Sequence, residues 1–121
     1  IQIIKGWTEN GKINEVVYDV ICSDDREINN RNNKCKETKA SVNFENCSFD
    51  ENYGSDRLEV IWTDTEYTPN QNTFYYARAI ENPTCRWSTY DSIRIDEKPA
   101  KNYPKITREM AWSSPIWIKN K

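Results

Sequence analysis

Histidine is missing from this chain of 121 residues, and leucine occurs only once, at Leu58. Without histidine there is no imidazole to bind a metal ion or to activate a serine nucleophile, so Ser88, Ser113 and Ser114 lack the partner that such catalysis needs. Hydrophobic residues make up 36% of the chain, which is below the usual share for a globular domain. The sequence therefore argues against a self-contained enzyme.

Long apolar runs and a surplus of positive charge are also missing. No stretch approaches the roughly 20 apolar residues of a membrane-spanning helix. The 17 basic and 19 acidic residues are interspersed and give a net charge of −2, without the basic stripe that neutralises phosphates. We expect neither a nucleic-acid partner nor a membrane partner.

Aromatic residues are abundant. Five tryptophans, seven tyrosines and three phenylalanines can bury a large area per residue, so a compact core is possible despite the single leucine. The length suits one domain, and neither a linker nor a repeat divides it. We expect a single domain spanning residues 1–121, and since the sequence starts directly in a strand-like segment without methionine, we interpret it as a fragment of a longer protein.

The four cysteines are Cys22, Cys35, Cys47 and Cys85. The nearest two are 12 positions apart, whereas zinc sites usually have closely spaced cysteine or histidine ligands. The even count favours two disulfides in an oxidising compartment, periplasmic or secreted, although a four-thiolate zinc site or free thiols stay open. Of the three possible pairings we favour Cys22–Cys35, which would pin a polar loop, with Cys47–Cys85 joining distant segments.

Alternating apolar and polar residues predict short strands separated by turns. The expected strands cover residues 1–7, 13–22, 40–49, 57–64, Thr73–Ile80 and 109–120, the last interrupted by Pro115. Asn10-Gly11 is a strong hairpin signal between the first two, and residues 23–39 form a polar loop. This pattern predicts an all-β fold, specifically an immunoglobulin-like antiparallel β-sandwich.

The segment of residues 86–94 differs from the strands. Its apolar residues recur every third position, which predicts one short helical segment. Its candidate site residues are Arg86, Trp87, Tyr90, Asp91 and Arg94. We interpret the segment as a structural corner, in which Asp91 pairs with one of the arginines and both aromatic rings fill the core. There are two alternatives: the segment could form a domain interface, or it could contact a substrate directly, with Arg86 binding a phosphate group.

Two further clusters have simpler readings. The loop carboxylates Asp24, Asp25, Asp50, Glu51 and Asp56 lack the spacing of a calcium loop, so we expect them to be solvated. The five tryptophans are Trp7, Trp62, Trp87, Trp112 and Trp117. They could form a sugar-stacking face, but alternation places most of them inward, which favours core packing.

Four stretches resemble a known family: IQIIKGWTENGKINEVVYDV, LEVIWTDTEYTPNQNTFYYAR, FYYARAIENPTCRWSTYD and MAWSSPIWI. They are similar to the C-terminal end of a large bacterial family of uncharacterised proteins, domain-of-unknown-function family 3604. Members of that family look like PHP-type metallophosphoesterases in their catalytic part. The resemblance covers nearly the whole chain, with residues 23–39 the least distinctive.

The resemblance implies a much longer protein whose metal ligands, largely His and Asp, lie upstream of Ile1. It transfers no catalytic residue, no metal ligand and no cofactor to this chain; divalent metals belong to the upstream part. The chain would then be a non-catalytic C-terminal module that packs against the upstream catalytic domain, its partner, in a PHP-like metal-dependent hydrolase. The alternative is an independent carbohydrate- or protein-binding β-sandwich module.

Overall fold

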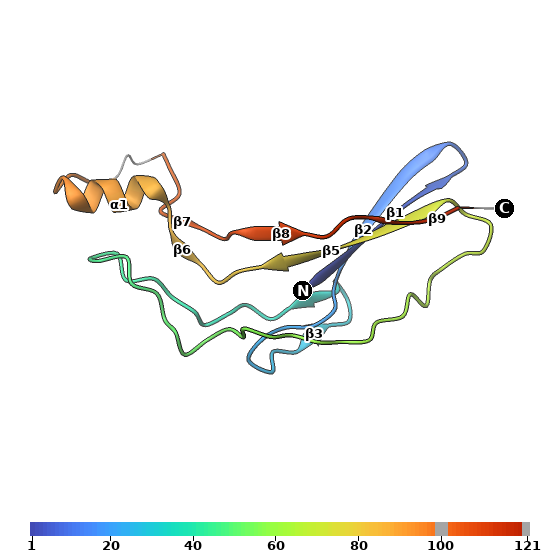
Figure 1. Ribbon diagram of the computed structural model, residues 1–121, viewed down its shortest axis with the longest axis horizontal. Coiled ribbons are helices and arrows are strands. Elements are labelled where there is room, and N and C mark those ends of the chain that lie inside the picture. The colour runs from blue at the N-terminus through green and yellow to red at the C-terminus, as the bar shows by residue number, and fades with distance from the viewer. Residues whose placement is uncertain (99–101, 120–121) are drawn as a thin grey trace.

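The computed structural model describes residues 1–98 and 102–119 of the chain (Figure 1). In chain order the elements are β1 (Gln2–Glu9), β2 (Lys12–Asp19), β3 (Ile28–Asn29), β4 (Lys34–Cys35), β5 (Thr73–Ile80), β6 (Thr84–Cys85), α1 (Trp87–Arg94), β7 (Ile106–Thr107), β8 (Met110–Trp112) and β9 (Ile116–Ile118). The predicted end of the last strand at residue 120 lies outside the described residues. The fold is all-β and antiparallel with one short helix, as the sequence predicted.

A five-stranded antiparallel sheet forms the centre of the molecule. Its order is β2-β1-β5-β8, and β9 pairs with β5 next to β8. The β1–β2 hairpin turns at Asn10 and Gly11, whose φ angles of 50° and 75° are the left-handed values that this type of turn requires. The predicted hairpin is therefore confirmed, as is the strand at Thr73–Ile80.

One face of the sheet is covered by its own side chains. The register places Phe74 opposite Gly6 and Tyr76 opposite Ile4, and the two aromatic rings are stacked at 6.4 Å. The Phe74 ring occupies the space that a Cβ at position 6 would need, which explains the glycine in mid-strand. Ile4 is buried beneath this layer and belongs to the small core.

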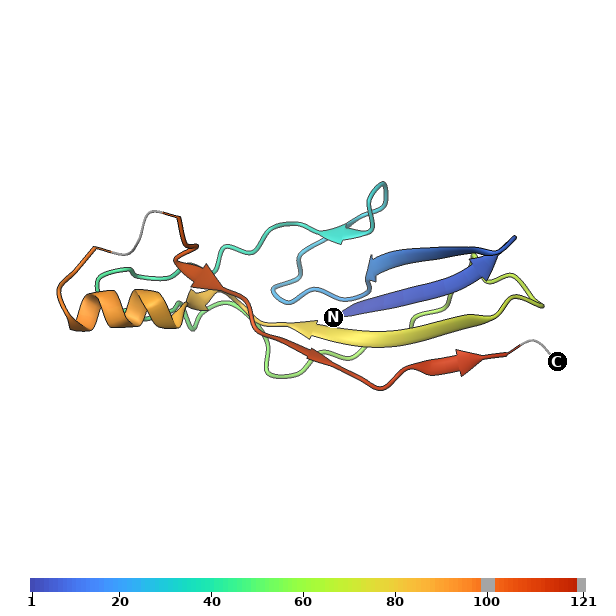
Figure 2. The same cartoon turned by 90° about the horizontal axis from the view of Figure 1, so that it is seen from above.

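The opposite face is covered by an extended second layer. After β4 the chain runs out to the helical end of the molecule and returns below the sheet to the start of β5 (Figures 1 and 2). On the return, Trp62 packs against the rings of Tyr18 and Tyr75 at 5.2 and 6.3 Å. The two layers make the fold sandwich-like.

The predicted strands at residues 40–49 and 57–64 are wrong as sheet strands. The first contributes only an isolated bridge, Val42 to Phe49, and the second has no strand assignment. Side chains of Asn43 and Asn46 accept hydrogen bonds from backbone N–H groups two residues ahead, and such turns compete with sheet pairing. In the second segment Leu58, Trp62 and Asp64 are less exposed than their neighbours, whereas Val60, on the same predicted face, is 44% exposed. The immunoglobulin-like topology stays a prediction.

The polar loop of residues 23–39 contains a small ribbon that the sequence did not reveal. Ile28 pairs with Cys35 and Asn29 with Lys34. The Asn29 side chain accepts from the backbone N–H of Arg31, and Asn33 has the left-handed φ of 56°. Asparagine-rich turns thus form a hairpin in which Ile28 is the one aliphatic residue.

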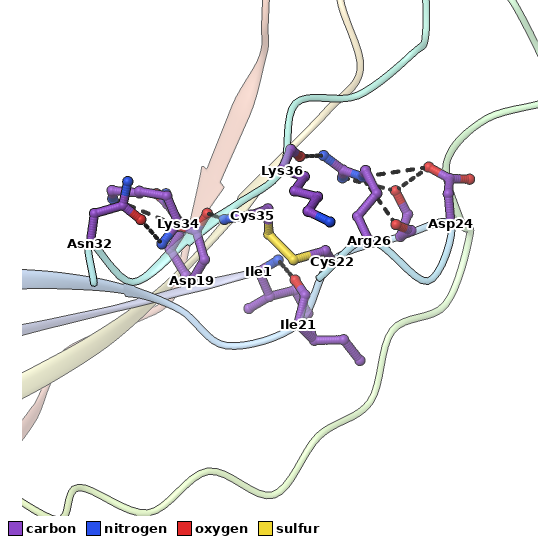
Figure 3. The surroundings of a disulfide bond; sticks show 12 residues. Ile1, Asp19, Ile21, Cys22, Asp24, Arg26, Asn32, Lys34, Cys35 and Lys36 are labelled. Atoms are coloured by element: carbon purple, nitrogen blue, oxygen red, sulfur yellow. Dashed lines mark hydrogen bonds and ion pairs between the residues drawn. A yellow bond between two sulfur atoms is a disulfide. The ribbon is translucent and has the colours of Figure 1, made fainter. Parts of the chain in front are cut away.

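Both disulfides form with the favoured pairing, Cys22–Cys35 and Cys47–Cys85. The first fastens the β3–β4 ribbon to the end of β2 (Figure 3). The second joins the tip of the extended layer to β6, immediately before α1. The disulfides therefore anchor the polar loop of residues 23–39 and the tip of the extended layer to neighbouring segments.

Candidate functional site

The corner predicted from residues 86–94 contains the helix α1, as expected. Its polar residues Thr89 and Ser92 are buried, while Trp87 is 70% exposed. The Thr89 hydroxyl donates to the carbonyl of Lys105 at 2.7 Å, and the Ser92 hydroxyl donates to the carbonyl of Thr89 at 2.9 Å. The helix thus turns its hydroxyl side inward and its aromatic side outward.

The expectation that Trp87 and Tyr90 fill the core is therefore wrong. Both rings are exposed, together with Ile93 one turn further along. Among the ion pairs of the described residues there is none between Asp91 and either Arg86 or Arg94. The corner is held by the Cys47–Cys85 disulfide and by backbone bonds instead, which leaves its apolar side for another contact.

A buried ion pair that sequence reasoning missed lies at the centre of the molecule. Lys5 Nζ is 2.6 Å from Asp64 Oδ2, and the two side chains are only 3% and 9% exposed. Lys5 Nζ also donates to the carbonyl of Glu66 at 3.0 Å, and the Tyr75 hydroxyl donates to Asp64 at 2.6 Å. These bonds tie the extended layer to the sheet. One signal in the sequence could have indicated this pair: a lysine interrupts the apolar run of residues 1–7, where an unpaired charge would be costly to bury.

Two tyrosines and the aspartate of this cluster have shifted pKa values. Burial, helped by the hydrogen bond to Glu66, raises the pKa of Tyr18, and burial together with the bond to Asp64 raises that of Tyr75. Burial alone would raise the pKa of Asp64, but hydrogen bonds from Lys5, Tyr75 and the Glu66 backbone outweigh it and lower the pKa. With both phenols protonated and the carboxylate ionised, the cluster is a fixed set of donors and acceptors.

The lowered pKa of Asp64 predicts an acid-sensitive contribution to stability. The folded state binds a proton at Asp64 less readily than the unfolded state does. The stabilisation from the ionised carboxylate is therefore complete above pH 3.8, the ordinary pKa of aspartate, and is lost as the pH falls from there through the lower pKa of the folded state. Urea midpoints measured between neutral pH and pH 2 should show an acid limb that Asp64→Asn flattens. Asp56→Asn, at an exposed carboxylate, is the matched control. An unchanged limb in Asp64→Asn would contradict the assignment.

A cleft of about 500 Å³ lies beside the Cys22–Cys35 disulfide. Arg26 lines it, but its guanidinium already donates to the carbonyls of Ser23 and Lys36, at 3.1 and 2.8 Å (Figure 3). Arg108, also in the lining, donates to the carbonyl of Glu81 at 3.0 Å. These cations are engaged in holding loops together.

A second cleft, of about 740 Å³, lies between residues 49–58 and 79–84. Asp50, Glu51 and Asp56 line it, together with Phe49 and Tyr53. Within residues 1–98 and 102–119, no group of three or more Cys, Asp or Glu side chains is arranged to hold a metal ion.

Asp24, which we expected to be solvated, accepts a hydrogen bond from the Gly54 backbone at 2.9 Å.

Exposed apolar side chains are the most distinctive surface feature. Three of the five tryptophans, Trp87, Trp112 and Trp117, are exposed, so the expectation that most tryptophans lie inside is wrong. The other large exposed hydrophobic residues include Ile13, Ile61, Tyr90, Ile93, Ile95, Met110, Ile116 and Ile118. Among the described residues only Ile4, Val20, Cys47 and Cys85 form a buried hydrophobic core. This distribution is typical of an interaction surface.

No helix of the described residues is long and apolar enough to cross a membrane. Comparison with known proteins gives no match among the curated proteins or the solved structures. A family model described as "Protein of unknown function (DUF3604)" matches residues 1–120, which is almost the entire chain. The chain therefore belongs to the DUF3604 family.

Proposed function

We propose that the chain is the non-catalytic C-terminal β-sandwich module of a larger PHP-like metal-dependent hydrolase, and that it packs against the catalytic part. The chain belongs to the DUF3604 family, and the PHP-like catalytic part is what the sequence resemblance implies for the longer proteins of that family. Divalent metals and their His and Asp ligands are then expected upstream of Ile1. The chain alone has no histidine to offer such a site.

The observation that carries the proposal is the accessible surface of 9645 Å². A compact monomer of 14.3 kDa exposes about 6,800 Å² by the usual scaling of area with mass. The excess of roughly 2,800 Å² is larger than the about 800 Å² that each partner buries in a standard interface, and is comparable with the upper end of the roughly 1,000–2,500 Å² that each partner buries in obligate assemblies. The large exposed apolar side chains, among them Trp87, Trp112 and Trp117, support docking onto a large, permanent partner such as a neighbouring domain.

The two disulfides support a periplasmic or secreted location for the protein, because such bridges persist in oxidising compartments. The alternative role, binding of carbohydrate, would use exposed tryptophans as stacking platforms. Trp87 lies on α1 at one end of the elongated molecule, whereas Trp117 lies on β9 towards the other end (Figure 1). Such distant rings do not make one platform, which favours the docking role.

The proposal predicts that the exposed side of α1 stabilises only the longer protein. Trp87→Ser together with Tyr90→Ser should lower the thermal midpoint of the full-length protein by several degrees and leave that of residues 1–121 almost unchanged, since both rings are exposed there. Asp91→Ser, on the same helix, is the matched control for a polar exposed position. Differential scanning fluorimetry of both proteins provides the measurement.

The catalytic half of the proposal needs its own assay. Phosphoester hydrolysis with added Mn²⁺ should be found in the full-length protein and not in residues 1–121. Hydrolysis by the short chain, or equal effects of the double variant on both proteins, would contradict the proposed role.

A further inference from the structure

The two edges of the central sheet have different chemistry. β2, at one edge, includes Lys12, Glu15 and Asp19, and the Asp19 backbone N–H donates to the carbonyl of Asn33 at 2.9 Å. Charged residues and covering loops of this kind protect an edge from unwanted pairing. β2 therefore has the features of a true sheet edge.

The other edge lacks this protection. β8 and β9 follow β5 as one kinked strand, linked by the Ser113 backbone N–H, which donates to the carbonyl of Ala77 at 3.0 Å. From Met110 to Ile118 there is no charged residue. All residues of β8 and β9 are exposed on the chain alone. An uncharged and exposed strand of this length is rare at a free sheet edge.

β9 is apolar on both faces of the sheet. Trp117 lies opposite Phe74, with ring centroids 5.0 Å apart, and is 64% exposed. Its neighbours Ile116 and Ile118 project to the opposite face, and Ile116 is 69% exposed. Strands that are apolar on both faces are typical of the interior of a sheet that is covered on both sides.

We infer that β8 and β9 are an internal strand of a larger sheet, and that the next strand is contributed by the same polypeptide from outside residues 1–121. This inference rests on the proposed role as one module of a longer protein. The added strand pairs with the outward-facing backbone groups of β8 and β9, and its side chains cover Trp112, Ile116 and Trp117. The module is thereby fixed to the body of the protein by main-chain hydrogen bonds as well as by apolar contacts.

A second copy of the chain fits the surface less well than another part of the same protein. A twofold dimer through the β8–β9 edges would cover this edge but leave the aromatic side of α1, at the far end of the long axis, in solvent (Figure 2). One large body that reaches both regions accounts for the whole surface.

Hydrogen–deuterium exchange of the natural full-length protein tests the inference. In an antiparallel edge strand about half of the backbone amides point away from the sheet and exchange rapidly. With a further strand in place, nearly all amides of the peptide covering residues 109–118 should be protected, Pro115 having none. In full-length Ile116→Lys the protection should fall to about half, whereas Ile13→Lys, at an exposed isoleucine of the opposite edge, should leave it intact.

The outcomes separate this inference from the proposed role. If only half of these amides are protected while the α1 peptide is shielded, the added strand is refuted and the docked module stands. If the protection disappears on dilution and the protein sediments as a dimer, the occupant is a second copy and the inference fails. A natural protein that consists only of residues 1–121 would refute both.

Discussion

The double substitution Cys47→Ser and Cys85→Ser will release the helical corner and lower the free energy of unfolding of the chain by about 4 kcal/mol. This value is the closure entropy of the loop between the two cysteines, which the disulfide removes from the unfolded state. The two cysteines are separated by 38 positions, and the bridge joins the extended layer to the strand that precedes α1. Few other contacts of the described residues join the extended layer to this end: Lys105 Nζ lies 5.2 Å from the centre of the Phe44 ring, and the Asn82 side chain donates to the carbonyl of Tyr53 at 2.9 Å.

Urea unfolding followed by circular dichroism measures the loss, and limited proteolysis locates it. Cleavage should begin within residues 40–50 and near α1. The matched control is serine at Cys22 and Cys35, whose separation of 13 gives the smaller closure term of about 3 kcal/mol. A loss in the Cys47 and Cys85 variant that is smaller than the loss in the control, or proteolysis that starts elsewhere, would show that the core and not the bridge holds the corner.

The substitution Lys5→Met will destabilise the chain by about 3–5 kcal/mol, which is the usual cost of leaving one member of a buried ion pair without its partner. Asp64 would keep its charge in a place where only 9% of its side chain meets solvent. The extended layer would also lose the bond from Lys5 to the Glu66 carbonyl. Urea unfolding at neutral pH gives the free energy of unfolding. A change in the tryptophan emission spectrum, as Trp62 leaves the rings of Tyr18 and Tyr75, reports detachment of the extended layer.

A double-mutant cycle isolates the pair. Asp64→Asn keeps an acceptor for the Tyr75 hydroxyl, so Lys5→Met with Asp64→Asn should cost clearly less than the sum of the single changes. The pair Arg57–Glu59, at 2.9 Å but 82% and 78% exposed, is the surface control, and breaking it should have little effect. Additive effects at Lys5 and Asp64 would mean that their contact contributes nothing beyond packing.

Local signals in the sequence predicted the elements that depend on neighbouring residues. Asn10-Gly11 identified the hairpin because few residues other than asparagine and glycine accept two successive left-handed φ angles readily. The period of three identified the helix of residues 86–94, although not the side that would face solvent. Alternation identified β5 as a strand, and its two faces make different contacts: Phe74 and Tyr76 stack on one side, while the Tyr75 hydroxyl donates to Asp64 on the other.

The candidate site was less predictable than the strands. The sequence selected Trp87, Tyr90 and Asp91 as a packed corner, because aromatic residues at helical spacing usually face a core. It gave no indication that Lys5 and Asp64, 59 positions apart in the sequence, would meet at 2.6 Å. Such contacts depend on how the extended layer returns beneath the sheet, which no local pattern encodes.

The sequence by itself determined the all-β class, the first hairpin and the helix, and it favoured the disulfide pairing that the structure confirmed. These features depend on backbone preferences and on side chains close in the chain, or on the few combinations that four cysteines allow. Only the tertiary structure decided that residues 57–64 lie on the sheet without joining it, and that most tryptophans remain outside. The physical reason is that burial depends on which surfaces meet when distant segments of the chain fold together, and no local pattern of residues encodes those contacts.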